Sequence, residues 1–155
     1  MPIDHSAIQA RIMKALNEQN FDEWETLVTE DYTEEYPQSG EIIRGRKKVR
    51  AVLDNYPGGG LLKDGLDVST TRIAATEARW VKTPTFTFVR AEGTGNVGTA
   101  AFKARYPDGS VWWVVIIYEL RGDRVAKSTT FFAPLFEAPE WRKPYTEKAE
   151  STDKP

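Results

Sequence analysis

The clearest structural signal in the chain is the stretch VWWVVIIYELRGDRVAKSTTFFAPLF, residues 111–136. It predicts two long strands, at 111–120 and 125–136, because apolar and β-branched residues dominate both halves. Gly122-Asp123 lies between them and supplies the backbone angles of a tight reversal. Three further strand-like runs precede this stretch, at 68–81, 85–92 and 97–106. The carboxy-terminal half of the chain is therefore predicted to form an antiparallel sheet.

Three helices are predicted in the amino-terminal third. Residues 4–19 place apolar side chains on one helix face, a shorter helix follows Asp22 as its cap, and a third covers residues 49–56. Between the second and third helices, residues 32–37 alternate with a period of two, which indicates a strand. Helices that precede the strands, without βαβ alternation, indicate an α+β fold with a mostly antiparallel sheet.

The composition narrows the class of protein. The chain has 155 residues, a formal charge of −2 and no cysteine. We expect one domain over residues 1–142 and a disordered tail at 143–155. The lack of cysteine excludes thiol catalysis and Cys zinc sites, and with the lack of an apolar leader it suggests a cytoplasmic protein. Balanced charge argues against nucleic-acid binding, and the longest apolar run, 111–118, is too short to span a membrane.

The strand at 111–118 is apolar on both of its faces. Helices in such a layout usually cover only one face of the sheet, so the second face also needs a cover. Burying that face against a copy of itself is the simplest solution. The sequence therefore predicts a homodimer that forms through the outer face of the sheet.

Three motifs suggest chemistry but have a simpler explanation. Gly93-Thr-Gly-Asn-Val-Gly98 matches a dinucleotide-binding string, yet strand-like residues follow it where a helix start is required, which favours a hairpin loop. The basic cluster at 44–50 has the spacing of a solvated helix start. His5 is the only histidine and has no companions for a metal site or a Ser-His-Asp triad. We expect neither a metal ion nor a cofactor.

Glu34 is the most informative charged residue. It lies between Tyr32 and Tyr36 on one face of the strand at 32–37, where its neighbours are expected to be buried. Removal of water from a carboxyl group raises its pKa, which is how general acids and bases are made. The alternative is a carboxylate at the rim that pairs with Arg or Lys, and the sequence leaves both interpretations open.

Two stretches of sequence resemble a known family. They are YTEEYPQSGEIIRGR at 32–46 and FFAPLFEAPEWR at 131–142, and with the predicted helices they are similar to SnoaL-like members of the nuclear transport factor 2-like superfamily, over about residues 5–142. The resemblance implies a cone-shaped α+β fold, in which a strongly curved, mostly antiparallel sheet wraps three helices and leaves an apolar pocket open at one end. Such proteins include polyketide cyclases, steroid isomerases, epoxide hydrolases and non-enzymatic binding modules.

The chain departs from the catalytic patterns of these relatives. Aligned on the motifs, the general-base Asp and the two oxyanion donors of the ketosteroid isomerases fall on Tyr36, Ile12 and Ile116, so all three chemical groups are missing. The last strand, where polyketide cyclases tend to place acids and histidine, has Lys-Ser-Thr-Thr at 127–130. Steroid isomerisation by that mechanism is therefore not expected, and acid/base cyclisation is put in doubt.

The same alignments and the strand alternation imply a set of pocket residues. Glu34 is the candidate acid/base, and Tyr36 or Tyr118 is the candidate hydrogen-bond donor. The residues expected to bind the ligand are Trp24, Tyr36, Phe86, Phe88, Val114, Ile116, Tyr118, Ser128, Thr130 and Phe132. An apolar lining with few polar groups suits a small hydrophobic or aromatic molecule.

Three functions remain open on these grounds. The first is a lyase or isomerase that acts on a polyketide-like or aromatic compound. The second is a binding module that uses the same pocket without catalysis, and the third is a protein-interaction scaffold whose cavity is filled by side chains.

Overall fold

The structure is a computed structural model that describes residues 2–55, 74–75, 79–80, 86–105 and 110–148. The helices are α1 (His5–Asn17), α2 (Phe21–Leu27) and α3 (Arg46–Asp54). The strands are β1 (Val28–Tyr36), β2 (Glu41–Arg44), β3 (Ala74–Ala75), β4 (Arg79–Trp80), β5 (Phe86–Thr94), β6 (Val97–Arg105), β7 (Val111–Arg121) and β8 (Arg124–Pro134). A short 3-10 helix, η2 (Lys143–Tyr145), lies near the carboxy terminus.

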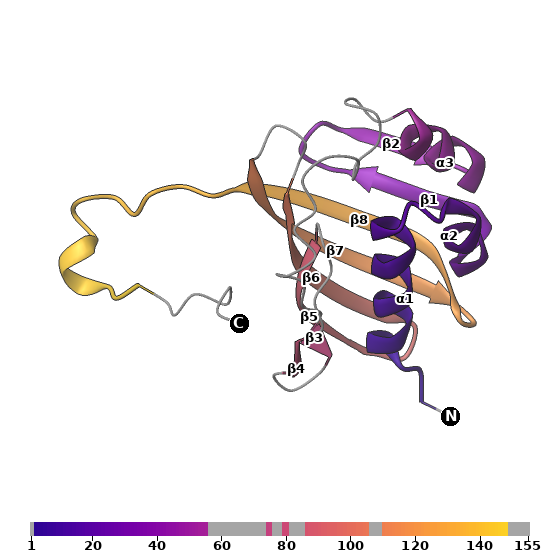
Figure 1. The fold of residues 1–155 in the computed structure, drawn as a ribbon, viewed down its shortest axis with the longest axis horizontal. Coiled ribbons are helices and arrows are strands. Elements are labelled where there is room, and N and C mark those ends of the chain that lie inside the picture. Colours follow the sequence, from indigo (N-terminus) through magenta and orange to yellow (C-terminus); the bar gives the residue numbers. More distant parts are fainter. Residues whose placement is uncertain (1, 56–73, 76–78, 81–85, 106–109, 149–155) are drawn as a thin grey trace.

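Six strands form one curved, open sheet in the order β2-β1-β8-β7-β6-β5 (Figure 1). Neighbouring strands are antiparallel except β1 and β8, which pair in parallel. The predicted α+β class and mostly antiparallel sheet are therefore confirmed. The parallel pair was not foreseen, and it brings the early strand β1 beside the last one. β3 and β4 form a separate two-stranded sheet.

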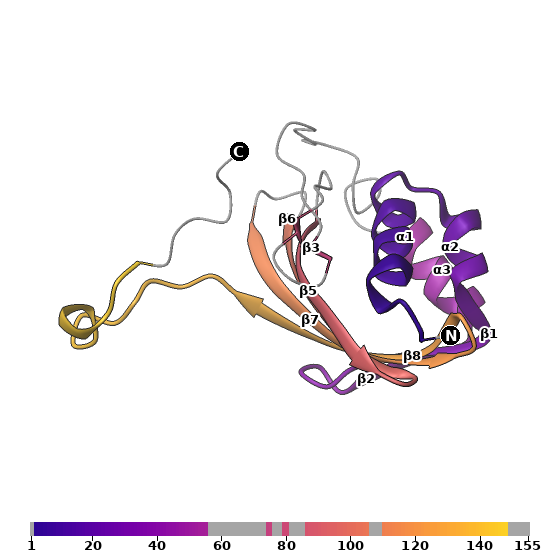
Figure 2. The same ribbon diagram turned by 90° about the horizontal axis from the view of Figure 1, so that it is seen from below.

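The three helices lie on the concave side of the curved sheet (Figure 2). α1 begins where the Asp4 side chain accepts a hydrogen bond from the backbone N–H of Ala7. α2 begins at Phe21 rather than after Asp22, because the Asn20 side chain accepts from the N–H of Glu23 and caps the helix two residues earlier. Both residue types cap well, so the sequence alone could not choose between them.

The core lies between the helices and the inner sheet face. Its largest members come from both layers, and they include Met13, Trp24, Leu27, Phe102 and Tyr118. The inner face of β5 and β6 carries small side chains that leave room for the helices. They are the fully buried alanines Ala91, Ala100 and Ala104. Large side chains on the helices and small ones on these strands therefore fill one continuous core.

The turns also agree with the sequence where the structure describes them. The Gly93 to Gly98 motif is the β5–β6 hairpin, with Thr94 paired to Val97 and Gly95 at a φ of 62°. Gly122, at a φ of 66°, is in the β7–β8 turn, as predicted. Of the strand predicted at 68–81, only β3 and β4 belong to the described residues.

Residues 135–148 extend from the end of β8 as an arm that leaves the body of the molecule (Figures 1 and 2). The arm contains η2, so the first six residues of the predicted disordered tail are described; residues 149–155 are not. None of the helices in the described part of the chain has the length and apolar character that a membrane crossing requires.

Candidate functional site

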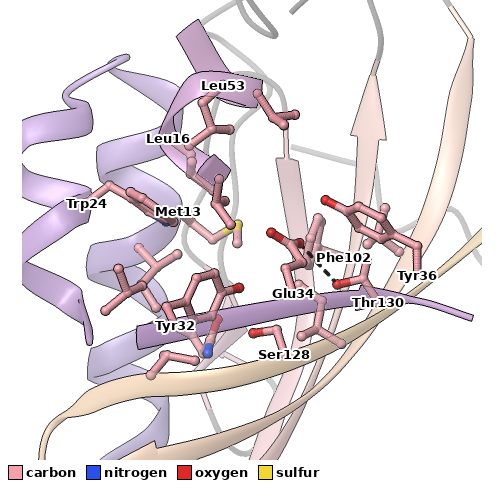
Figure 3. Close-up of a pocket in the computed structure, with 18 of the residues that line it drawn as sticks. Met13, Leu16, Trp24, Tyr32, Glu34, Tyr36, Leu53, Phe102, Ser128 and Thr130 are labelled. Carbon is pink, nitrogen blue, oxygen red and sulfur yellow. Dashed lines mark hydrogen bonds between the residues drawn. The ribbon is translucent and has the colours of Figure 1, made fainter. Parts of the chain in front are cut away.

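A pocket of about 170 Å³ lies between the helices and the inner face of the sheet (Figure 3). β1, β7 and β8 form one wall, and α1, α2 and α3 form the other. The lining residues are Gln9, Ile12, Met13, Leu16, Trp24, Val28, Tyr32, Glu34, Tyr36, Val49, Val52, Leu53, Phe102, Val114, Ile116, Val125, Ser128, Thr130 and Phe132.

The polar groups of the pocket form a stripe on its sheet wall. The alternation of β1 points Tyr32, Glu34 and Tyr36 inward, and the parallel pairing of β1 with β8 sets Glu34 opposite Ser128. The Thr130 hydroxyl donates to Glu34 Oε1 across 3.5 Å, and Figure 3 shows this carboxyl facing the interior of the pocket. Five polar side chains from two strands distant in sequence thus lie side by side.

The Glu34 carboxyl is the chemical centre of this stripe. Protein atoms surround it closely, although the open pocket leaves the residue half-buried rather than sealed. Loss of water raises the pKa of Glu34 from 4.5 to about 7, and hydrogen bonds from the Tyr36 and Thr130 side chains act in the opposite direction. Both the protonated and the ionised carboxyl are therefore populated near neutral pH.

The two tyrosines that flank Glu34 have different surroundings. Tyr32 is buried, its ring meets that of Trp24 edge-on at 5.9 Å, and its hydroxyl is hydrogen-bonded to Ser128. Burial, and secondarily the nearby Glu34 charge, raise the pKa of Tyr32 well above its usual value, so it stays a neutral phenol. Tyr36 lies nearer the edge of the sheet, with its ring 5.6 Å from that of Phe132.

The helical wall of the pocket is apolar except for the Gln9 amide on α1. α1 contributes Met13 and Leu16, and α3 contributes Val49, Val52 and Leu53. Among the described lining residues, Glu34 is the only carboxylate, and none is Lys, Arg or His. The carboxyl therefore faces a hydrophobic surface without a counter-charge from the described part of the chain.

Most of the predicted ligand-binding residues lie in this one pocket. Trp24, Tyr36, Val114, Ile116, Ser128, Thr130 and Phe132 line it together with Glu34. The backbone of Phe86 and Phe88 belongs to β5, but their side chains lie outside the described residues. Among the described residues, no Arg or Lys that could pair with Glu34 in the rim-carboxylate interpretation lines the pocket.

Tyr118 differs from its prediction. It is on the inner face as expected, but it is fully buried and does not line the pocket, because its hydroxyl is 2.8 Å from His5 Nδ1. His5 Nε2 lies 3.0 Å from the carbonyl oxygen of Gly95. A carbonyl can only accept, so Nε2 donates to Gly95, while Nδ1 is hydrogen-bonded to the Tyr118 hydroxyl. His5 therefore joins α1 to both β7 and the β5–β6 hairpin, and the Tyr118 hydroxyl is not available to orient a ligand.

Several residues that line the pocket were not predicted from the sequence. Gln9 and Met13 are four residues apart on α1, beside the apolar stripe that predicted the helix and includes Leu16. Phe102 pairs with Val114 across the β6–β7 ladder, so it shares the inner face that was predicted for Val114. Tyr32 shares the inward face of β1 with Glu34 and Tyr36, but it is not among the predicted ligand-binding residues.

The site shows no arrangement for a metal ion. No group of three or more His, Cys, Asp or Glu side chains that could hold one is found in the described ranges. What the pocket offers chemically is one carboxyl with an elevated pKa, two phenols, two hydroxyls and the Gln9 amide within an otherwise hydrophobic cavity.

Comparisons with known proteins agree with the fold. The model of a family described as SnoaL-like domain matches residues 10–128. An NTF-2 like protein of unknown function from Burkholderia xenovorans is 25% identical with a TM-score of 0.71, and the match covers 92% of this chain and 93% of that one. A putative ketosteroid isomerase from Kribbella flavida is 21% identical with a TM-score of 0.70, and the match covers 97% of this chain and 93% of that one.

A more distant structure is an LEH-like epoxide hydrolase from M. tuberculosis, with 15% identity, a TM-score of 0.59, and coverage of 83% of this chain and 82% of that one. For the structures from Kribbella flavida and M. tuberculosis, which are 21% and 15% identical, the similarity shows only a shared fold. No curated protein matches the chain in sequence.

Proposed function

Because the chain belongs to the SnoaL-like domain family, we propose that it binds a small hydrophobic or aromatic molecule in the pocket between helices and sheet, and that Glu34 acts there as an acid/base. The observation that carries this proposal is the position of the Glu34 carboxyl in an apolar pocket, with a pKa of about 7. A group that is half ionised at neutral pH can both accept and donate a proton.

The reaction that fits this site is a proton transfer of the lyase or isomerase kind. The ionised Glu34 takes a proton from carbon or oxygen of the ligand, and the protonated form returns one. Tyr36 is the candidate donor to a ligand oxygen, because its side chain is a neutral hydrogen-bonding group on the same wall and lines the pocket. The Thr130 hydroxyl, 3.5 Å from Oε1, holds the carboxyl in place.

The size of the pocket points to a ligand of one or two small rings. A cavity of about 150 Å³ lined by aliphatic and aromatic side chains is sufficient for benzene. The cavity here, at about 170 Å³, is slightly larger, and all of its polar groups except the Gln9 amide lie on the sheet wall. A planar molecule with a single oxygen or nitrogen substituent directed at Glu34 matches that distribution.

The charge of the pocket restricts the ligand further. A second carboxylate would meet Glu34 in a poorly hydrated space, and two like charges there repel strongly. A neutral molecule avoids this cost. We therefore expect uncharged ligands to be preferred over carboxylates and phosphates.

Binding without catalysis is the alternative function. The positions that would supply the base and oxyanion donors of a ketosteroid isomerase are Tyr36, Ile12 and Ile116, and here these side chains line the pocket without providing those groups. The interaction-scaffold function is less well supported, because the cavity is open rather than filled by side chains.

Benzisoxazole tests the acid/base role before the natural ligand is identified. A base removes the proton from the ring carbon, the nitrogen–oxygen bond breaks, and a cyanophenolate is released. We expect the protein to accelerate this ring opening, with a rate that rises through the ionisation of Glu34 near neutral pH. Glu34→Gln should reduce the acceleration by about 100-fold or more.

Glu35→Gln is the matched control, because Glu35 is the next residue of β1 and is directed to the other face, toward Lys127. It should leave the rate unchanged. Benzisoxazole could raise the melting temperature while the Glu34→Gln variant opens the benzisoxazole ring as fast as the native protein does. The pocket is then a binding site without acid/base catalysis. If no ring compound raises the melting temperature, both uses of the pocket are contradicted.

A further inference from the structure

The arm at residues 135–148 carries a series of exposed aromatic side chains. Phe136, Trp141 and Tyr145 are 80%, 73% and 84% exposed, and Leu135 beside them is also exposed. Large apolar side chains grouped on one exposed segment are unusual for a protein surface and mark an interaction site. In the body of the molecule, by contrast, the described aromatic residues are buried or half-buried except for Phe131.

The arm is ordered enough to present these side chains. Trp141 stacks with the Arg142 guanidinium at 6.0 Å, Lys143 pairs with Glu140, and η2 closes one turn. Pro134 and Pro139 restrict the backbone and keep the preceding residues extended. These contacts are local to the arm, and they give residues 140–145 a defined shape.

The outer face of the sheet has exposed apolar side chains that the described part of the chain leaves uncovered, and Lys103, Glu119 and Lys127 lie around them. Ile117 on β7 and Phe131 on β8 are 45% and 38% exposed, next to half-buried Val115, which pairs with Phe131 across the ladder. Val97 on β6 is exposed on the same face, opposite Glu119. The chain thus has two exposed apolar surfaces, the arm and this outer face, and β8 joins them directly.

The direction of the arm makes its own sheet a poor docking site. Figure 2 shows the arm leaving the end of β8 on the side away from the three helices and continuing outward. Folding back onto its own outer face would require the chain to reverse its direction just after Pro134, the last residue of β8. A second copy that packs on the outer face can accept the arm without any reversal.

We propose that the arm at residues 135–148 docks on the outer sheet face of a second copy of this chain, and that two copies exchange their arms symmetrically. In a two-fold dimer each copy provides one arm and one face, so both exposed surfaces are covered by the same contact. This inference is independent of the function of the pocket.

The apolar area involved is sufficient for a stable dimer. A buried aromatic side chain contributes about 150–250 Å², so three on each of two arms supply about 900–1,500 Å². Stable interfaces bury about 1,200–2,000 Å² in total, and the covered sheet faces add to the contribution of the arms. Phe136, Trp141 and Tyr145 are then the residues on which the dimer depends most, since such aromatics dominate interface energies.

Sedimentation of the full-length chain tests the proposal first. The native protein should be a dimer at micromolar concentration, and the combined substitution Phe136→Ser, Trp141→Ser and Tyr145→Ser should weaken dimerisation by about 100-fold or more. Glu137→Gln with Glu147→Gln is the control, because it alters the same arm without removing apolar area. The melting temperature of the monomeric variant shows that the body remains folded.

Cysteine cross-linking then tells which face receives the arm, and the chain contains no cysteine of its own. Ala138→Cys on the arm is made in one copy and Thr99→Cys on the outer face in another, and the two copies carry different tags. A short bifunctional maleimide should link the two tagged chains, and the triple serine substitution should abolish the link. Three results would overturn the proposal. The first is a link that forms only within one chain when both cysteines are placed in the same copy. The others are a native protein that is monomeric and a dimer that the serine substitutions do not weaken.

Discussion

At the scale of single residues, the function depends on how the surroundings of Glu34 alter its ionisation. Burial raises its pKa from 4.5 to about 7, so the folded state holds the proton more tightly than the unfolded chain does. The free energy of unfolding therefore falls as the pH rises from about 4.5 to about 7, and it is independent of this group on either side of that window. Such a cost at neutral pH is typical of a residue kept for function.

Glu34→Gln should remove this cost. The substitution keeps the shape and the hydrogen-bonding capacity of the side chain but cannot ionise. We expect the free energy of unfolding of the variant, relative to the native protein, to increase by roughly 3 kcal/mol between acidic and neutral pH. Urea unfolding at a series of pH values measures this difference. A difference that does not change with pH would contradict the elevated pKa, and Glu35→Gln gives the baseline.

Gly98 has a different residue-scale role. It lies opposite Tyr118 in the β6–β7 ladder, and a Cβ at this position would overlap the Tyr118 phenol and the His5 ring. Gly98→Ala should therefore lower the free energy of unfolding by about 3 kcal/mol, because the buried ring cannot move aside. Gly122→Ala, where φ is 66° and the space is open, should cost only about 1 kcal/mol. Thermal unfolding of both variants compares the two, and equal losses would mean that the close packing is not what requires glycine.

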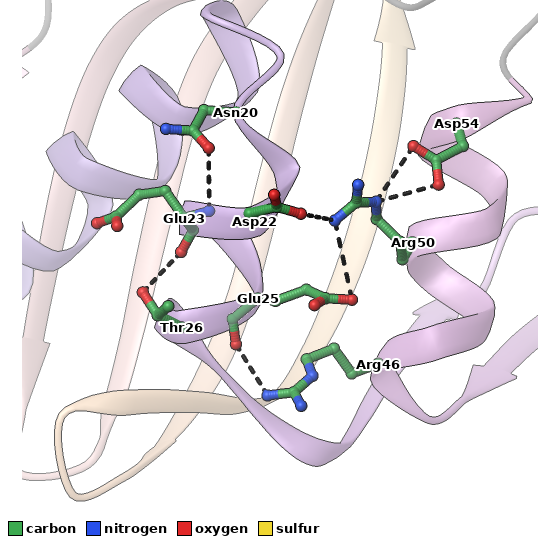
Figure 4. A network of polar contacts seen from close by, with 8 residues as sticks. All are labelled: Asn20, Asp22, Glu23, Glu25, Thr26, Arg46, Arg50 and Asp54. Carbon is green, nitrogen blue, oxygen red and sulfur yellow. Dashed lines mark hydrogen bonds and ion pairs between the residues drawn. The ribbon is translucent and has the colours of Figure 1, made fainter.

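At the scale of elements, the pocket depends on how α3 is held against α2. Arg50 on α3 contacts Asp22 at 2.8 Å, Glu25 at 3.9 Å and Asp54 at 3.0 Å, and Arg46 donates to the backbone carbonyl of Glu25 (Figure 4). The other face of α3 contributes Val49, Val52 and Leu53 to the pocket. This network therefore keeps one wall of the cavity in position.

Arg50→Gln should loosen this contact to a limited extent. The guanidinium is partly buried but its partners are largely exposed, so we expect a loss of about 1 kcal/mol in the free energy of unfolding, and less at high salt. Lys48→Gln removes the same charge from the exposed side of the helix and should have little effect. Amide hydrogen exchange in α3 should become faster only in the Arg50 variant. Equal exchange in both would show that apolar contacts alone hold the helix.

The sequence predicted the helices and strands better than it predicted which of them pair or contact one another. Apolar periodicity placed the helices and the β5–β8 strands within a few residues, because each pattern is local. The pairing of β1 with β8 was not predictable in this way, since it joins Glu34 to Ser128 across most of the chain. The same limit explains Tyr118, because its partner His5 is separated from it by 113 residues and no local pattern connects them.

At the scale of the whole molecule, the two layers create a cavity with one polar stripe, which we expect to select ligands by charge. Benzyl alcohol and benzoate are matched in size and differ in charge. Above neutral pH, where Glu34 is ionised, benzyl alcohol should bind at least about 30-fold more tightly than benzoate, because two carboxylates repel in a poorly hydrated pocket. Glu34→Gln should reduce this preference. Calorimetric titration measures both affinities, and equal binding of the two compounds would contradict the charge argument.

The most direct measurement is a carbon NMR titration of the Glu34 side-chain carboxyl in the free protein, with the resonance assigned by its loss in Glu34→Gln. We predict a midpoint at about pH 7, well separated from those of the exposed glutamates. A midpoint near the ordinary value of 4.5 would show that water and counter-charges reach this carboxyl, and it would remove the basis for an acid/base in the pocket.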